Sequence, residues 1–94
     1  MKYGDGLFES IRVINGKTQF LSLHFERLMK GMDFLKIDYD EKKIEEVKIC
    51  IEQLLVKNEI NKGGRVRLTI FRSGEGKYHP ETNKLSYFIE AHPL

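Results

Sequence analysis

Residues 7–18, LFESIRVINGKT, have the sequence pattern of a β-hairpin. Side chains alternate along the stretch from Leu7 to Ile14, as in a strand whose two faces meet different surroundings. Asn15-Gly16 is the pair favoured in two-residue type I′ turns, because both residues tolerate positive φ. The chain is then predicted to return as a second strand from Lys17 to Phe20. The first strand would carry Phe8, Ser10, Arg12 and Ile14 on one face, and Leu7, Glu9, Ile11 and Val13 on the other.

The next two segments have the period of amphipathic helices. The first apolar stripe consists of Phe25, Leu28, Met29, Met32 and Leu35, and Ser22 is the expected N-cap. A break is predicted at residues 37–40, after which Asp40 caps a second helix that ends near Asn58 to Asn61. The stripe of that helix consists of Ile44, Val47, Ile51, Leu54 and Leu55.

The last part of the chain alternates again and predicts two strands. Gly63-Gly64 is expected to release the chain from the helix, and Arg65 to Arg72 is the first of these strands. A loop from Ser73 to Asn83 leads to an antiparallel strand from Leu85 to His92. The order β-β-α-α-β-β predicts an α+β fold, a single domain over residues 1–94, in which two helices pack on one face of an antiparallel sheet.

Composition excludes several classes of protein. The net charge of +2, from 16 basic and 14 acidic residues, is too small to indicate nucleic-acid binding. Cys50 is the only cysteine, which excludes a disulfide framework and favours a reducing compartment. Cys50 is expected to be a buried small side chain. No apolar run approaches the roughly 18 residues of a membrane span, and no signal peptide is visible, so a soluble cytoplasmic protein is expected.

Two arginine patterns could bind an anion. His24 and Arg27 lie at the start of the first predicted helix, where backbone N–H groups attract negative charge. Arg65 and Arg67 place two guanidinium groups on one strand face, and the planar guanidinium suits a carboxylate or a phosphate. Taken alone, each pattern is better explained without a ligand: the first by a solvated arginine and a packed histidine, the second by an ordinary polar sheet face. No metal site is expected, because His24, His79 and His92 lack ligand spacing.

Three segments taken together resemble the class IV (fold-type IV) pyridoxal-phosphate-dependent aminotransferases. They are YGDGLFESIRV at residues 3–13 followed by Asn15-Gly16, HFERL at residues 24–28, and RVRLTI at residues 65–70 with Arg72, a glycine loop and Pro80. The family includes branched-chain and D-amino-acid aminotransferases and aminodeoxychorismate lyase. The order and the intervals of the segments agree over nearly the whole chain.

The resemblance implies roles for four residues. Arg27 matches the arginine that binds the 5′-phosphate of pyridoxal phosphate. Phe8 matches the aromatic residue that lines the substrate pocket, and Arg67 matches the strand arginine that helps to hold the substrate α-carboxylate in branched-chain enzymes. His79, with Lys77, falls near the loop pair that binds the carboxylate in D-amino-acid enzymes. Arg65 stands where branched-chain enzymes often carry tyrosine, which is a departure from that pattern.

The resemblance also implies what this chain lacks. The Schiff-base lysine belongs to a larger C-terminal domain that no part of the sequence matches, so no catalytic residue is expected here, and the chain on its own is expected to be inactive. The strand that usually precedes the Gly-Asp-Gly turn is expected to be missing. The implied partners are the larger C-terminal domain, an amino-acid or 2-oxo-acid substrate, and other copies of the same protein in a homo-oligomer.

Several functions stay open at this point. The leading interpretation is a fragment of an aminotransferase most like the branched-chain type, and the next is a fragment of an aminodeoxychorismate lyase. A binding module that keeps the fold without catalysis is a third. A small RNA-binding domain that uses Arg65, Arg67 and Phe71 is a fourth, and the near-neutral charge argues against it.

Overall fold

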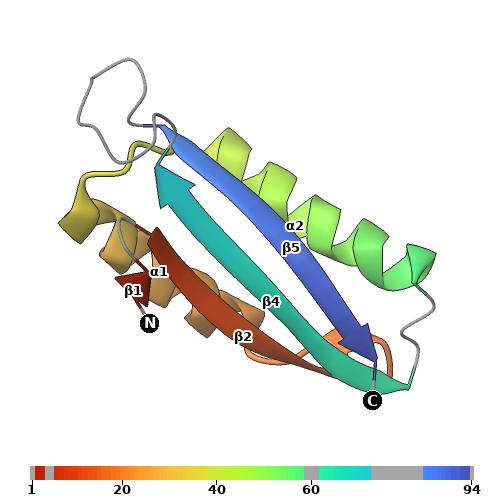
Figure 1. Cartoon of the computed structure of the whole chain (residues 1–94). Helices are drawn as coiled ribbons and strands as arrows, with labels where there is room; N and C mark the ends of the chain where they lie inside the picture. Colours follow the sequence, from red (N-terminus) through yellow and green to blue (C-terminus); the bar gives the residue numbers. More distant parts are fainter. Residues whose placement is uncertain (1, 4–5, 59–61, 73–83, 94) are drawn as a thin grey trace.

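The computed structural model describes residues 2–3, 6–58, 62–72 and 84–93 of the chain. The predicted α+β fold is confirmed: both helices lie against one face of an antiparallel sheet (Figure 1). The elements are β1 (Lys2–Tyr3), β2 (Gly6–Ile14), β3 (Lys17–Thr18), α1 (Leu21–Leu35), α2 (Glu41–Lys57), β4 (Gly63–Arg72) and β5 (Leu85–Pro93).

The sheet has the strand order β1-β2-β4-β5, and the short strand β3 is an additional strand that pairs with β2. Strand β4 lies in the middle, antiparallel to β2 on one side and to β5 on the other. Figure 1 shows α1 behind β1 and β2, and α2 running along β5. The expectation that no strand precedes β2 was therefore wrong, because Lys2 and Tyr3 pair with Leu7 and Gly6.

The hairpin forms at the predicted turn. Asn15 has a φ of 52° and Gly16 a φ of 74°, as a type I′ turn requires. The returning strand ends at Thr18 and not at Phe20, because Phe20 adopts a left-handed conformation (φ 56°) that turns the chain into α1. Phe20 is consequently the N-cap of α1 and no side chain caps this end, so the prediction of Ser22 as N-cap was wrong.

The second helix begins as predicted. The Asp40 carboxylate accepts a hydrogen bond of 2.8 Å from the Lys43 backbone N–H, which satisfies one of the free donors at the helix start. The helix ends at Lys57. Gly63 and Gly64 do not release the chain before β4. They belong to that strand, buried opposite Ile14 and Val13. The predicted loop from Ser73 to Asn83 lies outside the described residues.

One apolar core fills the space between the helices and the sheet. Its strand residues come from a single face of β2, β4 and β5, as the alternation predicted, and its helix residues come from both predicted stripes. Ile49 lies off the stripe of α2 and is exposed. The buried apolar residues are Ile11, Val13, Phe25, Leu28, Met32, Ile37, Ile44, Val47, Ile51, Leu55, Val66, Leu68, Ile70 and Leu85. No helix among the described residues is long and apolar enough to cross a membrane.

A polar contact at the edge of this core joins α2 to β5. The Tyr87 hydroxyl donates to Glu46 Oε2 at 2.8 Å and lies 3.3 Å from Cys50 Sγ. Burial, together with these two contacts, raises the pKa of Tyr87. The same hydrogen bond, followed by one from Lys43, lowers the pKa of Glu46. Cys50 is half-buried and not fully buried as expected, because it faces this polar contact at the margin of the core.

Replacing Tyr87 with phenylalanine is expected to lower the free energy of unfolding by about 0.5–1.5 kcal/mol. The ring would still pack, and only the bond to Glu46 and the contact with Cys50 would be lost. Urea denaturation of the single variants Tyr87→Phe and Glu46→Ala and of the double variant measures the coupling between the two residues. Fully additive effects would contradict a direct interaction across α2 and β5.

Candidate functional site

The face of the sheet opposite the helices, here called the open face, carries most of the polar and aromatic strand residues. Strand alternation and the pairing register place these side chains on one surface. Neighbouring strands bring together residues that are far apart in the sequence. The open face consists of Phe8, Ser10 and Arg12 from β2, Arg65, Arg67, Thr69 and Phe71 from β4, and Ser86, Phe88, Glu90 and His92 from β5.

Two of the predicted substrate-binding residues meet on the open face. The Arg67 guanidinium carbon lies 4.0 Å from the centre of the Phe8 ring, which is a cation–π distance. Phe8 pairs with Thr69 and Ser10 pairs with Arg67, so the contact crosses diagonally between β2 and β4. Arg65 makes a different contact on the same face, in which its Nη1 donates to Ser10 Oγ at 2.9 Å. The face thus presents an arginine whose guanidinium lies over an aromatic ring, a suitable arrangement for an anionic group.

Two further aromatic residues extend this surface toward the end of β4 and the start of β5. The rings of Phe71 and Phe88 have their centres 6.0 Å apart at 54°, a tilted aromatic pair. Both rings are exposed, whereas Thr69, which lies opposite both Phe8 and Phe88, is buried. Exposed aromatic rings close to a charged residue are typical of a surface that contacts another domain, another protein or a ligand.

Arg27, the predicted phosphate-binding residue, lies on the other side of the sheet. Its Nε and Nη2 donate to Glu9 Oε1 at 3.2 and 2.8 Å, and Glu9 belongs to the helix-covered face of β2. His24 Nδ1 lies 2.6 Å from the same oxygen, so this nitrogen carries the proton and donates. The Arg27 side chain is 66% exposed and borders a hollow of about 590 Å³ beside α1, together with Lys30. Glu9 therefore holds one edge of the Arg27 guanidinium, while most of the Arg27 side chain is accessible to solvent.

The structure thus divides the predicted site residues into two groups. Phe8 and Arg67 lie together on the open face, while Arg27 and His24 lie together on α1. Consecutive residues of β2 connect the two groups. Phe8 lies on the open face, and Glu9 lies on the helix-covered face, where it contacts His24 and Arg27. His79 and Lys77 fall outside the described residues.

Glu9 is the residue that sequence reasoning missed. It was placed on a strand face with Leu7, Ile11 and Val13, and no role was assigned to it. A single carboxylate on an otherwise apolar strand face is costly to bury without partners, and this pattern was a usable signal. The partners themselves are His24 and Arg27 of α1, which lie 15 and 18 residues further along the chain than Glu9.

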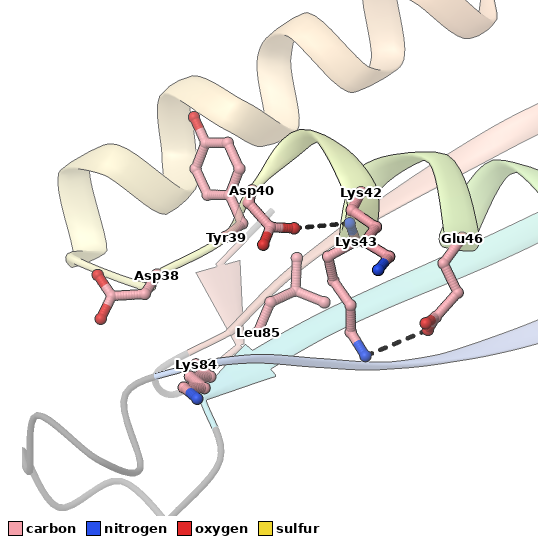
Figure 2. Close-up of a pocket in the computed structure, with 8 residues that line it drawn as sticks. All are labelled: Asp38, Tyr39, Asp40, Lys42, Lys43, Glu46, Lys84 and Leu85. Carbon is pink, nitrogen blue, oxygen red and sulfur yellow. Dashed lines mark hydrogen bonds and ion pairs between the residues drawn. The ribbon is translucent and has the colours of Figure 1, made fainter.

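A second hollow, of about 410 Å³, opens where α2 and β5 begin (Figure 2). It contains none of the predicted site residues. Asp40 is engaged at the cap of α2, and Lys43 Nζ lies 3.1 Å from Glu46 Oε2. Its charges largely neutralise one another, since three lysines face three carboxylates. Its lining residues are Asp38, Tyr39, Asp40, Lys42, Lys43, Glu46, Lys84 and Leu85.

Metal ligands do not cluster in the part of the chain that the structure describes. No group of three or more histidine, cysteine, aspartate or glutamate side chains there is arranged to hold an ion. The contacts of the candidate site are instead those of arginine with a carboxylate and with an aromatic ring.

Comparison with known proteins identifies the family. The model of the class IV amino-transferase family matches residues 6–94. The aminodeoxychorismate lyase of Bacillus subtilis is 39% identical over 69 residues, which cover 72% of this chain and 23% of that protein. The D-alanine aminotransferase of Staphylococcus haemolyticus is 34% identical over 62 residues, which cover 66% of this chain and 22% of that protein.

A solved structure shares the fold. The crystal structure of a candidate 4-amino-4-deoxychorismate lyase from Legionella pneumophila superposes with a TM-score of 0.77, at 22% identity, over 97% of this chain and 34% of that one. The chain belongs to the class IV aminotransferase family. It spans less than a quarter of the length of the curated relatives named above.

Proposed function

We propose that this chain forms one wall of a pyridoxal-phosphate site in a class IV aminotransferase or lyase, and that it supplies no catalytic residue of its own. The observation that carries the proposal is the placement of Arg67 on the Phe8 ring, at 4.0 Å, on the open face of the sheet. Phe8 would form the apolar wall of the substrate pocket, and Arg67 would attract the substrate carboxylate. His79 is proposed as a further substrate contact on the basis of the resemblance.

The residues present fit one part of the cofactor, its phosphate. Arg27 borders an accessible hollow, and a guanidinium can bind a phosphate through two parallel N–H···O bonds. Nε and Nη2 each use one N–H on Glu9, and the second N–H of Nη2 together with the two of Nη1 can donate to a phosphate. When bound, pyridoxal phosphate supplies an electron sink that stabilises negative charge on the substrate carbon bearing the amino group. The role of this chain would be to bind and orient, by holding the phosphate at Arg27 and the substrate at Phe8 and Arg67.

The Schiff-base lysine would lie in a larger C-terminal domain, with residues 1–94 forming the smaller domain. Two observations support this division. The relatives named above are several times longer than the matched region, and the open face exposes Phe71 and Phe88, which a second domain would cover. A homo-oligomer and a cytoplasmic location are part of the same proposal.

Two activities compete for the complete enzyme. Transamination of branched-chain substrates is favoured by phenylalanine at position 8, as the resemblance implies. Aminodeoxychorismate lyase activity is favoured by the similarity to the Bacillus subtilis lyase and to the Legionella structure. To separate them, the polypeptide should be isolated as its source organism makes it, its intact mass determined, and both activities assayed with pyridoxal phosphate. A mass of 11.0 kDa with neither activity would contradict the proposal and favour a binding module of the same fold.

Replacing Arg27 with alanine is expected to weaken pyridoxal-phosphate binding in the complete enzyme by about 1.5–3 kcal/mol, the contribution of a hydrogen bond to a charged group. The affinity can be measured by titrating the apo-enzyme and following cofactor absorbance. Arg12→Ala is the matched control, because it removes an exposed arginine from the open face without touching α1. Equal affinity of the Arg27→Ala variant and the unaltered enzyme would remove Arg27 from the phosphate site.

A further inference from the structure

Glu9 is placed to do more than fill a strand position. Its side chain is only 11% exposed, and its Oε1 lies within hydrogen-bond distance of three nitrogens, His24 Nδ1 and Arg27 Nε and Nη2. A carboxylate this deeply placed needs such partners, because leaving it without them would cost several kcal/mol. All three contacts reach the same oxygen from α1. These contacts therefore link β2 to α1 at the helical turn that carries Arg27.

These contacts restrict the orientation of the Arg27 side chain. An arginine side chain loses considerable rotamer freedom when it is immobilised. Two hydrogen bonds, from Nε and Nη2, hold one edge of the guanidinium against Glu9 Oε1 and so limit where the side chain can lie. His24 Nδ1 lies 3.5 Å from Arg27 Nη2, but both atoms act as donors to Glu9, so this approach adds no hydrogen bond between them.

We infer that Glu9 is a positioning residue for the cofactor phosphate, which orders the Arg27 guanidinium on α1 before the phosphate binds. This rests on the proposed function of Arg27. The ordering means that phosphate binding does not itself have to immobilise the side chain, and that the donors of Nη1 are presented in one direction. Because Glu9 follows Phe8 directly in β2, a single rigid strand also sets the distance between the phosphate contact and the substrate pocket wall.

An opposite effect of Glu9 competes with this one. Its negative charge partly neutralises Arg27, and removing that charge would strengthen attraction for an anion. The two effects predict opposite changes in phosphate affinity when Glu9 is removed. If ordering dominates, loss of Glu9 weakens phosphate binding; if neutralisation dominates, loss of Glu9 strengthens it. The neighbouring charges that bear on Arg27 from α1 are Glu26 and Lys30, which pair with each other at 3.8 Å.

The test compares two ligands that differ only in the phosphate, pyridoxal phosphate and pyridoxal. Both would be titrated into the complete apo-enzyme carrying Glu9→Ala, Glu9→Gln, Arg27→Ala or Glu9→Ala with Arg27→Ala. Glu9→Ala is expected to reduce pyridoxal-phosphate affinity about tenfold, the approximate equivalent of the lost ordering. Affinity for pyridoxal should change less than twofold, since a merely structural defect would weaken both ligands alike. Glu9→Gln, which keeps an acceptor oxygen, should recover part of the loss.

The outcomes separate this inference from the proposed function. If Arg27→Ala reduces the preference for pyridoxal phosphate and Glu9→Ala leaves it unchanged or increases it, the positioning role is overturned while the phosphate role of Arg27 stands. If Arg27→Ala itself leaves the preference unchanged, the phosphate role fails. In the double variant, Glu9→Ala should add nothing to Arg27→Ala, because the residue acts through Arg27. Additive losses would overturn the inference.

Discussion

Phe25→Ala is expected to lower the free energy of unfolding by about 3–5 kcal/mol, the range for truncating a buried aromatic ring. The Phe25 side chain is 1% exposed in the centre of the core. Lys48 Nζ also lies 5.2 Å from the centre of its ring, and this cation–π contact joins α2 to α1. Because small domains are stable by only about 5–15 kcal/mol, the variant should be largely unfolded in modest urea concentrations.

The matched control is Phe34→Ala in the same helix. Phe34 is 82% exposed, so its truncation should change stability by no more than about 0.5 kcal/mol. Urea titration followed by circular dichroism gives both values, and the two variants have the same change in chemistry. A comparable loss of stability in both would mean that the inner face of α1 has been wrongly assigned.

Val66→Asp is expected to have the second large effect and to prevent folding at neutral pH. Val66 is fully buried on β4, opposite Ile11 and Ala91. A buried carboxylate without a partner costs several kcal/mol even after relaxation. Burial favours the neutral acid and so raises the folded-state pKa above the unfolded value of about 3.9. The variant should therefore be most stable below that value and should lose stability as the pH rises toward 7.

The adjacent position supplies the control. Arg65 lies on the open face, opposite Arg12 on β2 and His92 on β5. An aspartate there would be solvated and would set a negative charge beside Arg12 in place of a positive one. This attraction offsets the loss of the Arg65 hydrogen bond to Ser10, so Arg65→Asp should change stability by no more than about 0.5 kcal/mol. Thermal unfolding of both variants at acidic and neutral pH tests the alternation of β4 directly. A severe defect in Arg65→Asp with a mild one in Val66→Asp would reverse the assignment of the two faces.

Much of the fold could be predicted because its signals are local. The turn at Asn15-Gly16 depends on the conformational tolerance of two residues, and the cap at Asp40 depends on one side chain and the N–H three residues later. Alternation along β2 and β4 separates buried from exposed side chains without knowledge of the partner strand. The failures were also at element ends. Ser22 is a good N-cap by type, yet the left-handed conformation of Phe20 starts the helix one residue before it.

The candidate site was predictable only in part. Phe8, Arg27 and Arg67 were identified through the resemblance to the family, and their roles remain proposals. The contact between Phe8 and Arg67 depends on the register of β2 against β4, which joins residues 59 positions apart in the sequence. Glu9 was visible only as an acidic residue on an apolar face, because its partners His24 and Arg27 belong to another element.

Local pattern was therefore sufficient to define the two helices, the hairpin, the buried faces and the family to which the chain belongs. The pairing order of the strands, the separation of Arg27 from Phe8 by the thickness of the sheet, and the binding of Arg27 by Glu9 required the folded chain. The reason is physical. Helix periodicity, turns and caps depend on interactions within a few residues, whereas hydrogen-bond register and side-chain contacts between elements depend on which surfaces the core brings together.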